Sequence, residues 1–106
     1  MSGKTSRSRG KAGEREARNA LTDRDYDVLD TCDGLAVADI IAERYGVRYA
    51  VEVKHCRLID TERFWRQAKE QAKRHHARPM LMCRISRYPG SFLVLRDDEP
   101  PTVWNP

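Results

Sequence analysis

One stretch of eight residues, from Val47 to Lys54, constrains the fold most, because large apolar side chains alternate along it with small or charged ones. Such alternation predicts a β-strand with one buried face. The predicted core face consists of Val47, Tyr49, Val51 and Val53. The other face carries Glu52 and Lys54, which are two residues apart and so leave the strand on the same side. Ala50 on that face is expected to leave room for a ligand.

A second carboxylate lies in the preceding apolar run, residues 36–42, which predicts another strand carrying Asp39. A turn is expected over residues 43–46. A carboxylate within an apolar run is costly to bury unless it is paired or bound to a metal. Carboxylates on two adjoining strands, with an ammonium group beside them, can hold a divalent cation next to a phosphodiester. The alternative is structural: Asp39 caps a turn or pairs with Arg48 or Lys54.

The remaining pattern predicts two helices and three more strands around this pair. The expected elements are a disordered basic arm over residues 1–9, a helix over 11–21, a short strand from Tyr26, a helix from Asp60 or Thr61 to His76, and strands over 80–85 and 91–95. An irregular tail follows, in which Trp104 is expected to cover an apolar edge. The order α-β-β-β-α-β-β predicts an α/β fold, with residues 10–106 as a single domain.

The positive charge is concentrated at the start of the chain. The net charge of the 106 residues is +4, and residues 1–18 alone hold six basic and two acidic side chains. A basic arm of this kind is attracted to a phosphate backbone, where it releases counterions. The alternative is a solvated tail that keeps the protein soluble.

Cysteine usage and hydropathy indicate the compartment. The three cysteines are widely spaced and form no CxxC pair, which favours a reducing environment over a disulfide framework. Cys56, His75 and His76 lack the spacing of a zinc site. No apolar run is long enough for a membrane span or signal peptide. The protein is expected in the cytoplasm, or the host cytoplasm if a phage encodes it, with no membrane partner.

Three motifs in order resemble a known family. They are Gly10-x-x-x-Glu14-Arg15-Glu16 on an opening helix, Asp39-Ile40-Ile41-Ala42 on a strand, and Val51-Glu52-Val53-Lys54 on the next strand. This order resembles the archaeal-type Holliday junction resolvases, which belong to the restriction-endonuclease-like PD-(D/E)xK nuclease superfamily. The similarity runs from about Arg7 to Leu95. It implies a restriction-endonuclease-like core, in which helices flank a mixed central β-sheet.

The resemblance implies a metal-dependent endonuclease that hydrolyses DNA. The catalytic positions would be Glu14, Asp39, Glu52 and Lys54. Mg²⁺, for which Mn²⁺ is expected to substitute, would be bound by Asp39, Glu52 and the backbone carbonyl of Val53, with Glu14 as a further candidate ligand. The helical wheel does not choose between Glu14 and Glu16, because each lies near one border of the apolar face of the helix.

The resemblance also implies a DNA partner, branched or four-way, and a homodimer. Arg15 matches a basic residue that engages DNA, and the predicted DNA contacts are Arg7, Arg9, Lys11 and Arg15. Gln67 is expected near the site on the second helix, whereas Gln71 is expected on an exposed polar face. The cations at the end of that helix fit either the helix dipole or a basic track toward DNA.

The sequence departs from the family at one loop, which is acidic here and typically basic or serine-rich in the family. Asp30 and Asp33 would repel phosphate, and Asp33 is also a candidate for an outer-sphere metal contact. This departure leaves two alternatives open. One is a nicking, flap or single-strand-specific nuclease that uses the same site, and the other is a catalytically silent DNA-binding module.

Overall fold

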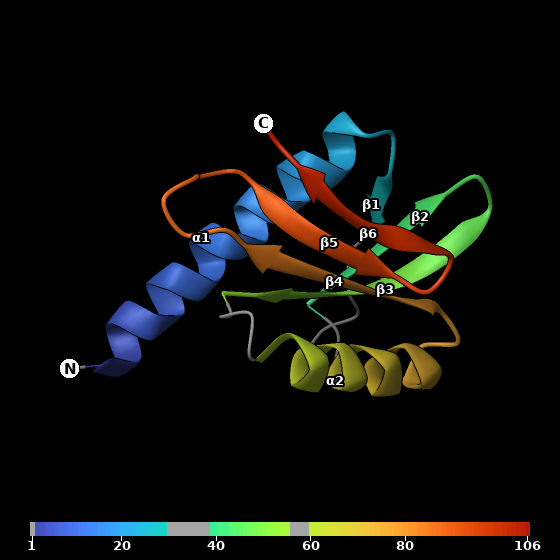
Figure 1. The fold of residues 1–106 in the computed structure, drawn as a ribbon, viewed down its shortest axis with the longest axis horizontal. Coiled ribbons are helices and arrows are strands. Elements are labelled where there is room, and N and C mark those ends of the chain that lie inside the picture. Colours follow the sequence, from blue (N-terminus) through green and yellow to red (C-terminus); the bar gives the residue numbers. More distant parts are fainter. Residues whose placement is uncertain (1, 30–38, 56–59) are drawn as a thin grey trace.

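The computed structural model describes residues 2–29, 39–55 and 60–106, and over residues 2–12 it describes the backbone alone (Figure 1). This part of the chain contains two helices and six strands. In chain order they are α1 (Ser2–Asp23), β1 (Asp27–Leu29), β2 (Ile40–Arg44), β3 (Val47–Lys54), α2 (Thr61–Arg74), β4 (Arg78–Arg84), β5 (Phe92–Arg96) and β6 (Glu99–Trp104). The third strand has the predicted bounds.

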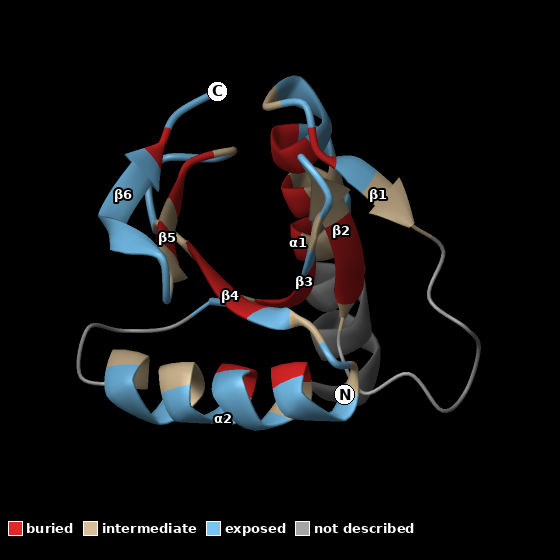
Figure 2. Ribbon diagram, turned by 90° about the vertical axis from the view of Figure 1, so that its right-hand side faces the viewer, coloured by how far each residue is buried: buried red, intermediate tan, exposed pale blue. Residues whose placement is uncertain are grey.

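The strands form one mixed sheet in the order β1-β2-β3-β4-β5-β6. Every neighbouring pair is antiparallel except β3 and β4, which are parallel. A parallel pair needs a long crossover connection, and α2 supplies it. The predicted α/β class with a mixed sheet is confirmed. The sheet curves strongly, with α1 against one face and α2 against the other (Figure 2).

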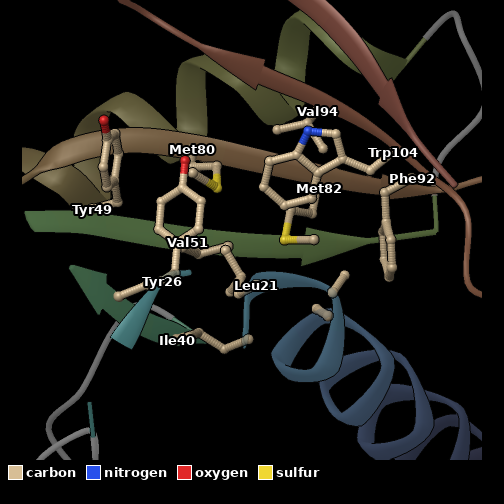
Figure 3. Close-up of a cluster of buried hydrophobic side chains, with 13 residues drawn as sticks. Leu21, Tyr26, Ile40, Tyr49, Val51, Met80, Met82, Phe92, Val94 and Trp104 are labelled. Atoms are coloured by element: carbon tan, nitrogen blue, oxygen red, sulfur yellow. The ribbon is translucent and has the colours of Figure 1, made fainter. Parts of the chain in front are cut away.

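The main core lies between α1 and the sheet. It is a cluster of buried side chains from α1 and all the strands except β1, and its largest members are shown in Figure 3. Tyr49 and Val51 are buried in it, and Val47 and Val53 pack against it. The predicted core face of β3 is therefore confirmed.

A thinner layer of apolar contacts lies between α2 and the sheet. Ala68 and Ala72 are buried there, and Phe64 and Trp65 pack beside Ala68, as the spacing of three and four residues predicted. Ala50 is fully buried in a cluster with Ala72. The prediction that Ala50 leaves room for a ligand is wrong, because α2 fills that space.

The C-terminal stretch is a strand, and not the irregular tail that its prolines suggested. β6 pairs antiparallel with β5 and forms one edge of the sheet. Prolines are tolerated on an edge strand, since no further strand needs their missing N–H groups. Pro100 and Pro101 are exposed there, and Trp104 is 7% exposed within the main core.

Two element boundaries also differ from expectation. α1 begins at Ser2, so the backbone of residues 2–9, expected to be an arm without regular structure, is helical here. Lysine and arginine are good helix formers, and extending a helix that is already packed costs little. β2 ends at Arg44, and the expected start of this strand lies outside the described residues.

In the part of the chain that the structure describes, neither helix combines the length and the apolar character that a membrane crossing requires.

Candidate metal centre and active site

Asp39 and Glu52 lie opposite each other across the β2–β3 ladder. Ile40 pairs with Val51 in this antiparallel hairpin. Asp39, one residue before Ile40, therefore faces Glu52, one residue after Val51. Asp39 Oδ2 accepts a hydrogen bond of 2.9 Å from the backbone N–H of Val53. This bond anchors the aspartate side chain on β3. The two carboxyl groups that the sequence placed on adjoining strands are thus brought together.

Glu52 is a buried carboxyl group with an unused oxygen. It is 4% exposed, and its Oε1 has no hydrogen-bond partner within the described residues. Burial raises the pKa of Glu52 to about 7, as do the negative charge of Asp39 and a hydrogen bond with it, while the charge of Lys54 acts in the opposite direction. An ionised carboxylate in this position is costly without a cation. The electrostatics of this pair therefore favour a bound cation.

Lys54 stands beside this pair on the α2 side of β3. The side chains of Ala50, Glu52 and Lys54 share one face of the strand, and Lys54 is half-buried. Its Nζ lies 5.2 Å from the ring centroid of Phe64 on α2. The ring holds the ammonium group near the carboxylates through a cation–π contact. The amine predicted beside the acidic pair is therefore in place.

The structure separates Glu14 from Glu16, which the helical wheel left undecided. Burial and the negative charge of Asp39 raise the pKa of Glu14, against the effect of Arg18. Glu16 instead accepts two hydrogen bonds of 3.2 Å from the guanidinium of Arg84 on β4. The two glutamates lie on opposite sides of α1, and Glu14 is the one that joins the acidic group.

A close approach between α1 and β4 accompanies this arrangement. A Cβ at Gly13 would lie 3.0 Å from Cδ of Arg84, so a larger residue would displace the arginine that binds Glu16. Sequence reasoning included Gly10 in the motif and missed Arg84 as the partner of Glu16. The available signal was Gly13, three residues before Glu16, because residues three apart lie on the same face of a helix.

The glutamines of α2 are placed the other way round from expectation. Gln67, expected near the site, is exposed, whereas Gln71 is half-buried and its Oε1 is buried without a hydrogen-bond partner in the described part of the chain. Gln71 follows Phe64 by seven residues, so both lie on one face of the helix. Gln71 is therefore on the side of α2 that carries the contact with Lys54.

The predicted DNA contacts are only partly described. Arg15 is exposed on α1. The side chains of Arg7, Arg9 and Lys11, and the acidic loop with Asp30 and Asp33, lie outside the described residues. At the basic end of α2, Lys73 lies 3.5 Å from Glu70.

Residues 13–29, 39–55 and 60–106 contain no group of three or more His, Cys, Asp and Glu side chains arranged to hold a metal ion. The predicted pair of carboxylates with a backbone carbonyl is smaller than such a group, and Glu14, the further candidate ligand, does not form a metal-holding group of three with Asp39 and Glu52. Mg²⁺ suits such a set because it keeps several of its waters. The unpaired Glu52 oxygen fits a cation as well.

No protein-family model matches this chain, and no curated protein matches it either.

Proposed function

We propose that this chain is a metal-dependent endodeoxyribonuclease, related in kind to the archaeal-type Holliday junction resolvases. The observation that carries the proposal is the pair of half-buried Asp39 and buried Glu52, with one Glu52 oxygen unpartnered and Lys54 on the same strand as Glu52. Paired carboxylates beside an amine are the arrangement that metal-assisted phosphodiester hydrolysis needs. The order of the three sequence motifs supports the same reading.

The fold is compatible with the restriction-endonuclease-like core that the proposal requires. A mixed sheet has α1 on one face and the β3–β4 crossover helix on the other. The acidic residues come from the outer end of the β2–β3 hairpin and from α1. The hairpin and α1, which are distant in sequence, thus contribute to one group of charges.

Asp39 and Glu52 would hold Mg²⁺, with Mn²⁺ as a substitute and the Val53 carbonyl as a further ligand. When bound, the ion would supply a water of lowered pKa and a positive charge beside the phosphoryl oxygen. The protein prepares the site in two ways. The Val53 N–H fixes the orientation of Asp39 through a hydrogen bond of 2.9 Å. Burial keeps water from solvating the charge of Glu52, so a divalent cation is favoured as the partner that neutralises it.

Lys54 and Glu14 have separate roles in this proposal. The Lys54 ammonium group, partly shielded from water and held by the Phe64 ring, stabilises the charge that develops on the phosphorane. Glu14 faces the same acidic group from α1, and its raised pKa suits a carboxyl group that orients the attacking water or a second ion.

Branched DNA is the proposed substrate, and a homodimer is the proposed active form. Two symmetric cuts across a four-way junction require two active sites, which a two-fold dimer provides. The concentration of positive charge in residues 1–18 supports a nucleic-acid partner. The predicted DNA contact Arg15 is exposed on α1, and Arg18 is the cation whose charge acts on Glu14.

The test is cleavage of a labelled mobile four-way junction by the purified protein, in Mg²⁺ and in EDTA. We expect symmetric nicks with Mg²⁺, none with EDTA, and none from Asp39→Asn with Mg²⁺. Asp27→Asn is the matched control, since this exposed aspartate on β1 is outside the site. Cleavage by Asp39→Asn at the wild-type rate would refute the proposal.

A panel of junction, flap, nicked duplex, single strand and linear duplex separates the alternatives. Faster cutting of the junction supports a resolvase, and faster cutting of a flap or a single strand indicates one of the other nucleases with the same site. DNA binding without product in Mg²⁺ or Mn²⁺ would identify a silent binding module.

A further inference from the structure

A second concave site lies beside α1, next to Glu16. This pocket, which we call the hairpin pocket, has a volume of about 240 Å³. Its wall comes from α1, the end of β3 and the connection between β4 and β5. The lining residues that matter here are Glu16, His55, Arg84, Ser86, Arg87 and Tyr88. Because Glu14 and Glu16 are on opposite sides of α1, the helix separates this pocket from Asp39.

His55 ties the hairpin pocket to the candidate active site. It follows Lys54 directly, and its Nε2 lies 2.9 Å from Ser86 Oγ in a hydrogen bond between their side chains. The end of β3 therefore carries the catalytic amine on one face and a wall of the pocket at the next residue. The two sites are thus joined through consecutive residues at the end of β3, on opposite faces of the strand.

The charges in the pocket leave an excess of positive charge. Arg84 and Glu16 neutralise each other through two hydrogen bonds of 3.2 Å. Arg87 has no ion pair or hydrogen bond from its guanidinium within the described residues, and it is exposed. An adjoining pocket of about 200 Å³ contains Asp23 as well as Glu16, against Arg24 alone. Of these two pockets, the hairpin pocket is the one with a positive excess.

The connection that presents Arg87 is held in a defined conformation. Three backbone hydrogen bonds of 3.0 to 3.3 Å close it, between Ile85 and Ser91, Tyr88 and Ile85, and Ser91 and Tyr88. Arg87 has a φ of 73°, which is uncommon for a residue with a side chain. Glycine would be the unstrained choice, so arginine adopts this conformation at a cost in backbone energy.

We infer that the hairpin pocket binds a backbone phosphate of the same DNA whose phosphodiester is held at Asp39 and Glu52. Arg87 supplies the unpaired guanidinium, which suits bidentate contact with phosphate oxygens. His55 and Ser86 add polar groups at the wall, and the volume accommodates a phosphate with its ordered waters. The inference rests on the proposed function in taking DNA as the ligand.

The experiment measures binding of a labelled four-way junction by fluorescence anisotropy over a series of salt concentrations, in EDTA, so that the metal site does not contribute. We expect Arg87→Ala to reduce the slope of log affinity against log salt by about 1, as loss of one phosphate contact does. Arg87→Lys should keep the wild-type slope. Arg48→Ala is the matched control, since Arg48 lies at the far end of β3 and is 54% exposed.

Three results would overturn the inference. The first is a wild-type slope in Arg87→Ala, and the second is an equal loss of slope in Arg48→Ala. The third is weaker binding in Tyr88→Ala together with no slope change in Arg87→Ala, which would indicate that a base stacks on the exposed Tyr88 ring. The two proposals fail separately. A protein that cuts no DNA but shows the Arg87 slope change loses the nuclease assignment and keeps the pocket. A protein that cuts DNA but shows no slope change in Arg87→Ala keeps the nuclease assignment and loses the pocket.

Discussion

Two clusters of charged side chains lie beside β3, and they differ in whether all their polar groups have partners. Near the start of the strand, Arg96 is 8% exposed and binds Asp98 at 2.8 Å and Glu99 at 3.4 Å. It also donates a 2.6 Å hydrogen bond to the hydroxyl of Tyr26. Tyr49 donates to Asp98 at 3.2 Å. Every member of this arginine cluster has an ion-pair or hydrogen-bond partner within the protein.

Toward the end of the strand, the acidic pair of Asp39 and Glu52 is left incomplete. The hydrogen bonds from Arg96 lower the pKa of Asp98, whereas burial and Asp39 raise the pKa of Glu52 to about 7. A fully paired buried network fixes a structure, and a buried carboxylate without a partner is costly unless a ligand completes it. The difference indicates that the arginine cluster serves stability and the acidic pair serves binding.

Replacing Glu52 by glutamine should have the largest effect on activity. We expect Glu52→Gln to lower the rate of DNA cleavage by about 10³-fold or more, because a ligand to the ion is lost. Stability at pH 8 should not fall, because the substitution removes a buried negative charge. Single-turnover cleavage and thermal unfolding measure the two quantities. If Glu52→Gln instead lowered the stability and left the activity per folded molecule unchanged, Glu52 would serve stability and not binding.

The stability of the metal-free protein should depend on pH through the same residue. A carboxyl group whose pKa is raised by folding contributes stability below its unfolded value of 4.5, and this is lost as pH rises toward 7. The free energy of unfolding should therefore fall by up to about 3 kcal/mol over this range, relative to Glu52→Gln. Denaturant unfolding in EDTA at several pH values measures it. Parallel pH curves for the two proteins would contradict the assignment.

Removing the central cation of the arginine cluster should cost stability and leave the chemistry alone. We expect Arg96→Met to lower the free energy of unfolding by about 2 kcal/mol, because it leaves the Tyr26 hydroxyl without its donor and Asp98 with Tyr49 as its remaining partner. The folded variant should cleave DNA at the wild-type rate. Loss of Mg²⁺-dependent cleavage in well-folded Arg96→Met would show that the two clusters are not separate.

The two glutamates of α1 should give the smallest and most discriminating difference. Glu14→Gln should lower cleavage by about tenfold, a change of roughly 1.4 kcal/mol, because Glu14 faces the acidic pair. Glu16→Gln should cost about 1 kcal/mol of stability or less, through the partly exposed pair with Arg84, with little effect on cleavage. Equal cleavage by the two variants would contradict the division of α1 into two sides.

Local patterns predicted the parts of the structure that depend on neighbouring residues. The alternation in β3 gave its bounds and its core face, and the spacing of Phe64, Ala68 and Ala72 gave the inner face of α2. β6 was missed because two prolines argue against a strand, and only its position at the sheet edge makes them acceptable.

The candidate site was predictable in its strands and undecided in its helices. Asp39 and Glu52 come together because a hairpin register sets them opposite each other, which is a local property. The choice of Glu14 over Glu16, and of Gln71 over Gln67, depends on which strand each helix face meets. That information is in the packing of distant segments, and the helical period alone does not contain it.

The most direct test of the central claim is calorimetric titration of Mg²⁺ into the metal-free protein near pH 6, in buffers of different ionisation enthalpy. An ion that binds at Asp39 and Glu52 must displace the proton that Glu52 holds below pH 7. The account predicts release of close to one proton per ion, and no release from Glu52→Gln. Binding without proton release, or identical titrations of the two proteins, would contradict it.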